Sequence, residues 1–139
     1  MKQKVAARLI IEVIGSPQAF VEETLKDVVV KLKEEKGVQL IKTDTYETEQ
    51  LENKFWSTFA EVELEAEDLR RLMGLCLDYL PSSVEILEPA GMDLDLSEVA
   101  HLVNDMLGRL HEYTLRIKNL QAEILYMQQN TPKNSEEKK

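Results

Sequence analysis

Cysteine is almost missing from this chain of 139 residues, with Cys76 as its one example. A single thiol excludes an intrachain disulfide and any zinc site built from several cysteines, and it fits a reducing compartment. Long hydrophobic runs are missing as well, and no window approaches the roughly 18 apolar residues of a transmembrane helix. The apolar run near the amino terminus is too short for a secretory signal and lacks a small-residue cleavage site. We therefore expect a cytoplasmic protein that does not enter membranes.

Basic side chains are in the minority, because 17 Lys and Arg residues stand against 26 Asp and Glu residues, for a net charge of -9. Residues 1–90 carry 11 basic and 18 acidic side chains, and residues 91–139 carry 6 and 8. Nucleic-acid backbones attract surfaces rich in Lys and Arg. Since neither half is basic, we expect no general binding of nucleic acid.

The first 90 residues predict one α+β domain. Strands are predicted over Val5–Ile14, Val38–Tyr46, Lys54–Ala66 and Val84–Leu87, with a turn over Glu47–Asn53. Helices are predicted after Ser16, with that residue as N-cap and Gly37 as the C′ residue, and from Glu67 to Pro81. The buried stripe of the second helix is expected to hold Leu69, Leu72, Met73, Cys76 and Leu80.

This order predicts a ferredoxin-like βαββαβ sandwich, with two helices on one face of an antiparallel sheet. The helix-covered face is expected to receive Leu9, Ile11, Val13, Trp56, Val62 and Leu64. The open face would keep Ile10, Phe55 and Phe59 among charged residues, so that one end of it needs cover.

A long amphipathic helix is predicted to follow, because apolar residues recur in alternating steps of three and four. The heptad a positions are Leu96, Val103, Leu110, Ile117 and Ile124, and the d positions are Val99, Met106, Tyr113, Leu120 and Met127. Asp95 and Glu98 form a predicted capping box at its start. A helix from Leu96 to Asn130 is roughly 50 Å long, whereas an ordinary strand spans about 17–20 Å.

The predicted domains are therefore a sandwich over residues 1–90, a heptad-patterned helix over 91–131, and a disordered tail over 132–139. We predict that the helix associates with other helices through Val103, Met106, Leu110, Tyr113, Ile117, Leu120, Ile124 and Met127. The simpler alternative is an amphipathic helix that lies on its own sheet. Apolar residues outside this seam leave the number of associating helices open. The residues that flank the seam leave the orientation of the helices open. The choice between a homo-oligomer and a helical partner protein stays open as well.

Other candidate sites have simpler explanations. His101 and His111 are ten residues apart and do not have the i,i+4 spacing that chelates a metal from one helix. Cys76 lies in an apolar stripe, which indicates a core thiol. The acidic row of Glu61, Glu63 and Glu65, with Glu12 across the ladder, is explained by a solvated sheet face, and a cation site or a docking face is the alternative. We expect no metal, no cofactor and no catalytic residues, and hence no enzyme.

Two segments resemble known families. The segment LIIEVIGSPQAFVEETLKDVVVKLKEEKGVQLIK (Leu9 to Lys42) resembles the first half of an ACT-type regulatory domain. That resemblance implies association through sheets and a site for an amino acid or nucleotide at a dimer interface, with Gly15 and Ser16 as ligand-site candidates. The segment EVELEAEDLRRLMGLCLDYL (Glu61 to Leu80) is similar to the strand-helix unit in the small dimerising subunit of the KEOPS tRNA-modification complex. The whole chain resembles small uncharacterised archaeal proteins with a ferredoxin-like (ACT-like) domain and a C-terminal coiled-coil helix.

The sequence thus favours a non-enzymatic interaction or scaffold protein that forms oligomers through its heptad helix. One alternative is an ACT-like module that binds a small molecule, and another is an accessory subunit of a tRNA-modification complex. Substitution of Ile117 and Leu120 by Asp separates the first two, because it disrupts the helix seam and leaves the Gly15 turn intact.

Overall fold

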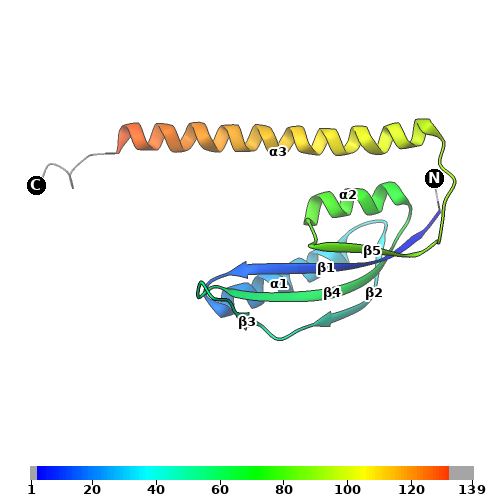
Figure 1. The fold of residues 1–139 in the computed structure, drawn as a ribbon, viewed down its shortest axis with the longest axis horizontal. Coiled ribbons are helices and arrows are strands. Elements are labelled where there is room, and N and C mark those ends of the chain that lie inside the picture. The colour runs from blue at the N-terminus through cyan, green and yellow to red at the C-terminus, as the bar shows by residue number, and fades with distance from the viewer. Residues whose placement is uncertain (1–2, 132–139) are drawn as a thin grey trace, which may run out of the picture. The chain divides into compact units, whose positions relative to one another are not determined.

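The computed structural model describes residues 3–131. Its elements are, in order, β1 (Val5–Gly15), α1 (Gln18–Glu34), β2 (Val38–Thr45), β3 (Glu49–Gln50), β4 (Trp56–Ala66), α2 (Leu69–Tyr79), β5 (Ser83–Glu88) and α3 (Leu96–Asn130) (Figure 1). The chain divides between Leu102 and Val103 into two compact units. The first unit holds the sheet with α1 and α2, and the second holds most of α3.

The sheet is antiparallel, with the strand order β2-β4-β1-β5. The central strands β1 and β4 pair over their whole length, from Val5 opposite Ala66 to Gly15 opposite Trp56. The predicted α+β class is confirmed, and the strand order is consistent with a ferredoxin-like arrangement.

One additional strand appears where the sequence predicts only a turn. Glu49 and Gln50 form β3 and pair with Ser57 and Trp56 at the start of β4. The predicted turn over Glu47–Asn53 is therefore wrong at these two residues. Both are exposed, and ladder hydrogen bonds need no apolar pattern, so side-chain periodicity carries no signal for this strand.

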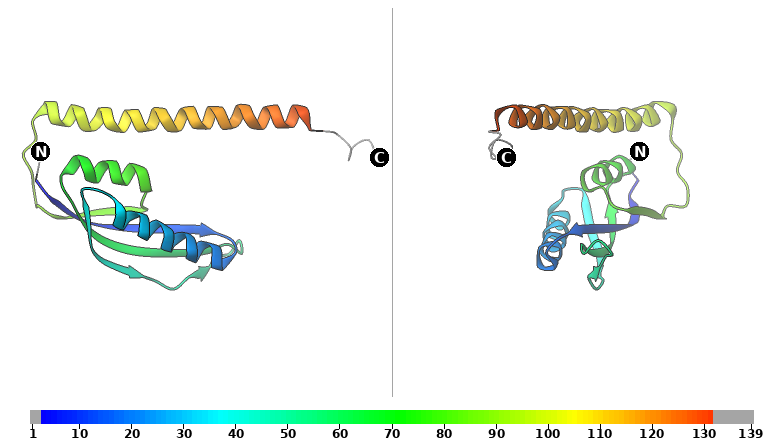
Figure 2. Two further views of the ribbon diagram at one scale, coloured as in Figure 1. Left: turned by 180° about the vertical axis from the view of Figure 1, so that it is seen from behind. Right: turned by 60° about the vertical axis from the view of Figure 1, so that its left-hand side comes forward.

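Helices α1 and α2 cover the same face of the sheet (Figure 2). Nine β1 and β4 residues on that face are at most 3% exposed, namely Val5, Ala7, Leu9, Ile11, Thr58, Ala60, Val62, Leu64 and Ala66, and Val13 and Trp56 at its end are half-buried. They pack with Leu25 and Leu32 from α1 and with Leu72 and Leu75 from α2. The inward positions predicted for Leu9, Ile11, Val62 and Leu64 are confirmed.

The predicted stripe of α2 is wrong at its last member. The helix ends at Tyr79, and Leu80 adopts a left-handed conformation with φ 46° that leaves it 66% exposed. Leu75 is fully buried in its place. Asp68 is the N-cap of α2 and accepts a hydrogen bond from the Arg71 backbone N–H at 2.7 Å.

The ends of α1 also differ from the prediction. Pro17 occupies the N-cap position and no side chain caps the helix, so Ser16 does not serve as the cap. The helix ends at Glu34 with Glu35 as C-cap. Gly37 therefore lies beyond the C′ position, and its φ of +75° serves the turn into β2.

Helix α3 begins and ends where the sequence predicts. The backbone N–H of Glu98 donates to Asp95 Oδ1 at 2.8 Å, and the backbone N–H of Asp95 donates to Glu98 Oε1 at 3.5 Å, which confirms the capping box. The first two turns of α3 belong to the first unit, where Leu102 is buried. The predicted tail over 132–139 lies outside the described residues.

Candidate functional site

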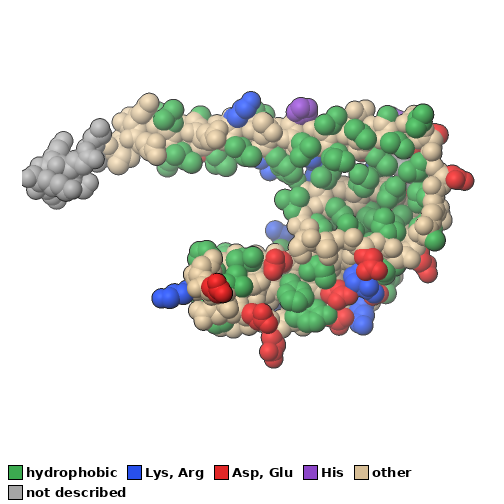
Figure 3. All heavy atoms as spheres, viewed as in Figure 1, with side chains coloured by type: hydrophobic (Ala, Val, Ile, Leu, Met, Phe, Trp, Pro, Cys, Tyr) green, Lys and Arg blue, Asp and Glu red, His purple; other side chains and the backbone are tan. Residues whose placement is uncertain are grey.

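The predicted seam of α3 carries large exposed apolar side chains. Ile117, Leu120, Ile124 and Met127 are 54–62% exposed, and Figure 3 shows hydrophobic side chains along the length of the helix. The other predicted seam residues are exposed or half-buried: Val103, Met106, Leu110 and Tyr113. Among the described residues of the second unit, 103–131, α3 is the one helix or strand, so the seam has no second element there against which to pack. The arrangement is therefore suited to packing against another helix.

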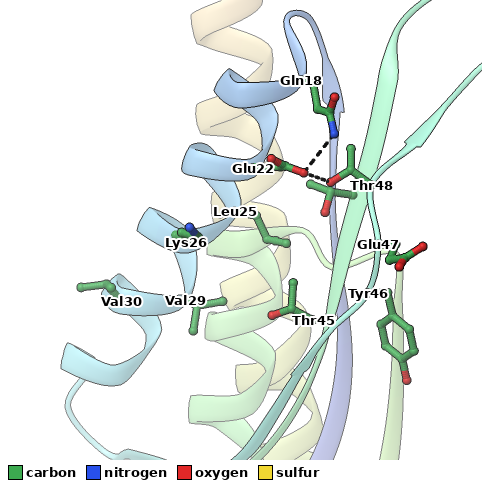
Figure 4. A pocket seen from close by; sticks show the side chains of 11 residues that line it. Gln18, Glu22, Leu25, Lys26, Val29, Val30, Thr45, Tyr46, Glu47 and Thr48 are labelled. Atoms are coloured by element: carbon green, nitrogen blue, oxygen red, sulfur yellow. Dashed lines mark hydrogen bonds between the residues drawn. The ribbon is translucent and has the colours of Figure 1, made fainter.

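A groove of about 760 Å³ lies in the sheet unit, between α1 and the segment from Thr45 to Thr48 (Figure 4). Its lining combines apolar groups with hydroxyls, an amide and charges, from Gln18, Glu22, Leu25, Lys26, Val29, Val30, Thr45, Tyr46, Glu47, Thr48 and Thr58. Thr58 is 1% exposed. The ring of Tyr46 points away from α1 in Figure 4, so this residue does not contribute its ring to the groove.

Glu22 joins the two sides of this groove. Its carboxylate accepts hydrogen bonds from the Thr48 hydroxyl, at 2.5 Å, and from the Gln18 amide, at 3.4 Å. These two hydrogen bonds lower the pKa of Glu22, and the bond from Thr48 has the larger effect. The groove thus presents an ionised carboxylate beside apolar side chains, which is typical of a site that orients a small molecule.

The ligand-site candidates Gly15 and Ser16 do not line this groove. Gly15 is the last residue of β1, and a Cβ added there would lie 3.3 Å from Val21 Cγ1. Ser16 is exposed, and Gln18 is the first residue along the chain that lines the groove. A ligand-binding role for Gly15 and Ser16 stays a prediction. The sequence analysis missed Glu22 and Thr48, since neither spacing nor periodicity brings them together.

The acidic row on the open face of the sheet surrounds one cation, Arg8, whose ion pairs the sequence does not predict. Arg8 forms ion pairs with Glu61 (Nε to Oε1, 2.8 Å), with Glu63 (Nη2 to Oε1, 2.8 Å) and with Glu85 (Nη1 to Oε2, 3.3 Å). The hydrogen bond to Glu63 raises the pKa of Arg8. β1 places Arg8 opposite Glu63 on one neighbouring strand and opposite Glu85 on the other. The row is thus part of an ion-pair network between three strands.

The same face carries further polar contacts, of which the one from Tyr46 joins the network. Lys4 Nζ lies 3.5 Å from Glu65 Oε1, and the Ser57 hydroxyl donates to Glu12 Oε2 at 2.9 Å. The Tyr46 hydroxyl donates to Glu61 at 3.0 Å, which raises the pKa of Tyr46. The Tyr46 ring stacks on Phe59, with 4.6 Å between the ring centroids.

A second polar cluster joins α2 to the C-cap of α1. Glu35 accepts hydrogen bonds from Arg71 Nη2 at 2.6 Å and from the Tyr79 hydroxyl at 2.9 Å. Arg71 Nε also donates to the backbone carbonyl of Lys36 at 2.8 Å. Burial, together with the bond to Glu35, raises the pKa of Tyr79 to about 12. This cluster fixes the two helices together and has the character of a structural clamp.

The remaining candidates form no site. Cys76 packs against the core, and burial raises the pKa of its thiol. His101 and His111 are exposed. Among residues 3–131, no group of three His, Cys, Asp or Glu side chains is placed to hold a metal ion. Over the same range, the helices lack the length or apolar character needed to cross a membrane.

A model of the MJ0538 family matches residues 6–134, which covers the sheet unit and α3 together. No curated protein and no solved structure matches the chain.

Proposed function

This chain belongs to the MJ0538 family, and from that premise we propose that it is a non-enzymatic interaction protein that associates with a second copy through α3. The family description names no activity, so the chain's own residues carry the proposal. The observation that supports it best is the exposed seam, in which Ile117, Leu120 and Ile124 are each more than half exposed.

The hydrophobic effect favours covering this seam. Moving one large aliphatic side chain from water into a packed interior contributes about 1.5–3 kcal/mol. Residues at the a and d positions of a 3.5-residue repeat pack as knobs into the holes of a facing helix. Two copies of α3 provide such holes for each other where their repeats overlap.

The edges of the sheet are poorly suited to association with a second copy. The edges belong to β5 and to β2, with the two-residue strand β3 also paired to β4. The pairing of β2 carries a register shift at Leu40/Lys42, and that of β5 carries one beside Ala6/Ala7. Such irregularities interrupt the row of free backbone groups that a second sheet needs for pairing. This favours α3 as the route of association.

Sedimentation velocity of the full chain tests the proposal. The double variant Ile117→Asp, Leu120→Asp is expected to be monomeric at concentrations where the unmodified chain forms oligomers, because it places charges in the apolar layers. The matched control, Asn104→Asp with Asn119→Asp, adds the same charge outside the seam and is expected to associate normally. An unmodified chain that sediments as a monomer would refute the proposal.

The groove beside α1 favours a second candidate function, the binding of a small molecule by the sheet unit. A ligand present at about 100 times its Kd stabilises a protein by about 2.7 kcal/mol. We expect at least one member of a panel of amino acids and nucleotides to raise the melting temperature. The Glu22→Gln variant should lose that shift, whereas Glu23→Gln, whose side chain does not line the groove, should keep it. An unchanged melting temperature across the panel would count against this candidate.

A further inference from the structure

The charges beside the α3 seam all lie on one flank. Because α3 is an unbroken helix from Leu96 to Asn130, one heptad frame applies throughout. In that frame the g positions between Val103 and Asn130 include Arg109, Arg116 and Glu123, and the e positions are Leu107, Thr114, Gln121 and Gln128. The g flank therefore carries both signs of charge, and the e flank is neutral.

This asymmetry distinguishes the two ways in which a pair of helices can align. In a parallel pair, each g residue faces the e residue five positions later on the other helix. Arg116 would then face Gln121, and Glu123 would face Gln128. A parallel pair therefore brings no opposite charges together.

In an antiparallel pair, the g flank of one helix faces the g flank of the other. With Ile117 of one copy opposite Leu120 of the second copy, Leu110 lies opposite Met127 and Tyr113 opposite Ile124. The same alignment places Arg116 opposite Glu123, and twofold symmetry repeats this contact. Both side chains are exposed, and neither forms an ion pair within residues 3–131.

The neighbouring antiparallel register has less favourable charge contacts. It moves one helix by one heptad and places Ile117 opposite Tyr113 of the second copy. That register also brings Arg109 opposite Glu123 on both sides of the symmetry axis, but the two Arg116 side chains then face each other across this axis, and like charges destabilise such a contact. The register with Arg116 opposite Glu123 forms two contacts between opposite charges and none between like charges.

Resting on the self-association proposed above, we infer that the partner of α3 is a second copy in antiparallel orientation, with Arg116 of each copy opposite Glu123 of the other. The g flank is complementary to itself only in this orientation. That self-complementarity favours a second copy over a different helical protein.

Charge reversal at the two g positions tests the pairing. Arg116→Glu alone and Glu123→Arg alone are each expected to raise the Kd for dimer formation about tenfold, because each creates two like-charge contacts. The combined variant should return to within about threefold of the unmodified chain. Lys118→Glu changes the net charge as Arg116→Glu does, but at a b position outside the seam, and should leave the Kd unchanged. Single reversals that match Lys118→Glu would overturn the pairing.

Spin-label distances in the full chain test the orientation, with Cys76→Ala as background. A label on Gln129→Cys has its twin roughly 30 Å away along the axis in the antiparallel pair, and within roughly 20 Å in a parallel pair. A label on Asn119→Cys has its twin at almost the same height in both. A short distance at both positions would overturn the inference and leave self-association standing. An Asn119 pair displaced by a further 12 Å or so would show the neighbouring register and overturn the Arg116–Glu123 contact. A monomer would overturn the proposed function itself.

Discussion

Gly37 shows how a single backbone conformation constrains the sequence. Its φ of +75° lies in the left-handed region, which glycine adopts freely and which a residue with a Cβ adopts at a cost of about 1–2 kcal/mol. A Cβ at this position would also lie 2.8 Å from Glu67 Cδ, the end of a flexible side chain that can move aside. Gly37→Ala is therefore expected to lower the free energy of unfolding of the sheet unit by about 1–2 kcal/mol, mainly through the backbone. Urea unfolding followed by Trp56 fluorescence measures this change.

Gly74 provides the matched control for that prediction. It lies inside α2, and a Cβ added there meets nothing within 4 Å. Alanine in a helix interior is more favourable than glycine by about 0.5–1 kcal/mol. The same substitution at Gly74 should therefore raise the free energy of unfolding, opposite in sign to Gly37→Ala. Equal effects at the two positions would show that the left-handed turn at Gly37 is not the cause.

At the scale of elements, short-range sequence patterns predict which residues form a strand or helix and which face of it is buried. The alternation in β1 and β4 identifies the buried face, and the Asp95–Glu98 capping box identifies the start of α3. The ends of α2 are harder to predict, since the left-handed conformation of Leu80 depends on how the chain turns toward β5.

Contacts between distant elements cannot be read from such patterns. Thr48 follows β2 and Glu22 lies in α1, and they meet only because the sheet brings both segments to one end of the groove. Arg8 likewise has acidic partners from β4 and β5, and their identity depends on strand register. The sequence therefore predicts the elements and the apolar seam, but not the groove or the ion-pair network.

At the scale of the whole molecule, the two units have different sources of stability. The sheet unit has a core of buried residues from β1, β4, α1 and α2. The helix from Val103 onward forms its own unit, and in proteins most of the stability of a helix comes from tertiary packing rather than from helix propensity. Association through the seam would supply that packing to α3. The helical content of α3 should therefore depend on protein concentration, whereas the folding of the sheet unit should not.

Dilution of the full chain should therefore separate the two units. Below the Kd for association, we expect helical ellipticity to fall while the fluorescence of Trp56, which lies in β4, stays constant. The Ile117→Asp, Leu120→Asp variant should show the lower ellipticity at every concentration, because it cannot form the apolar layers. The Asn104→Asp, Asn119→Asp control should follow the unmodified chain. If dissociation is seen by sedimentation and ellipticity does not change, the helix is stabilised without a second copy, and packing between copies is not what holds α3 in its helical form.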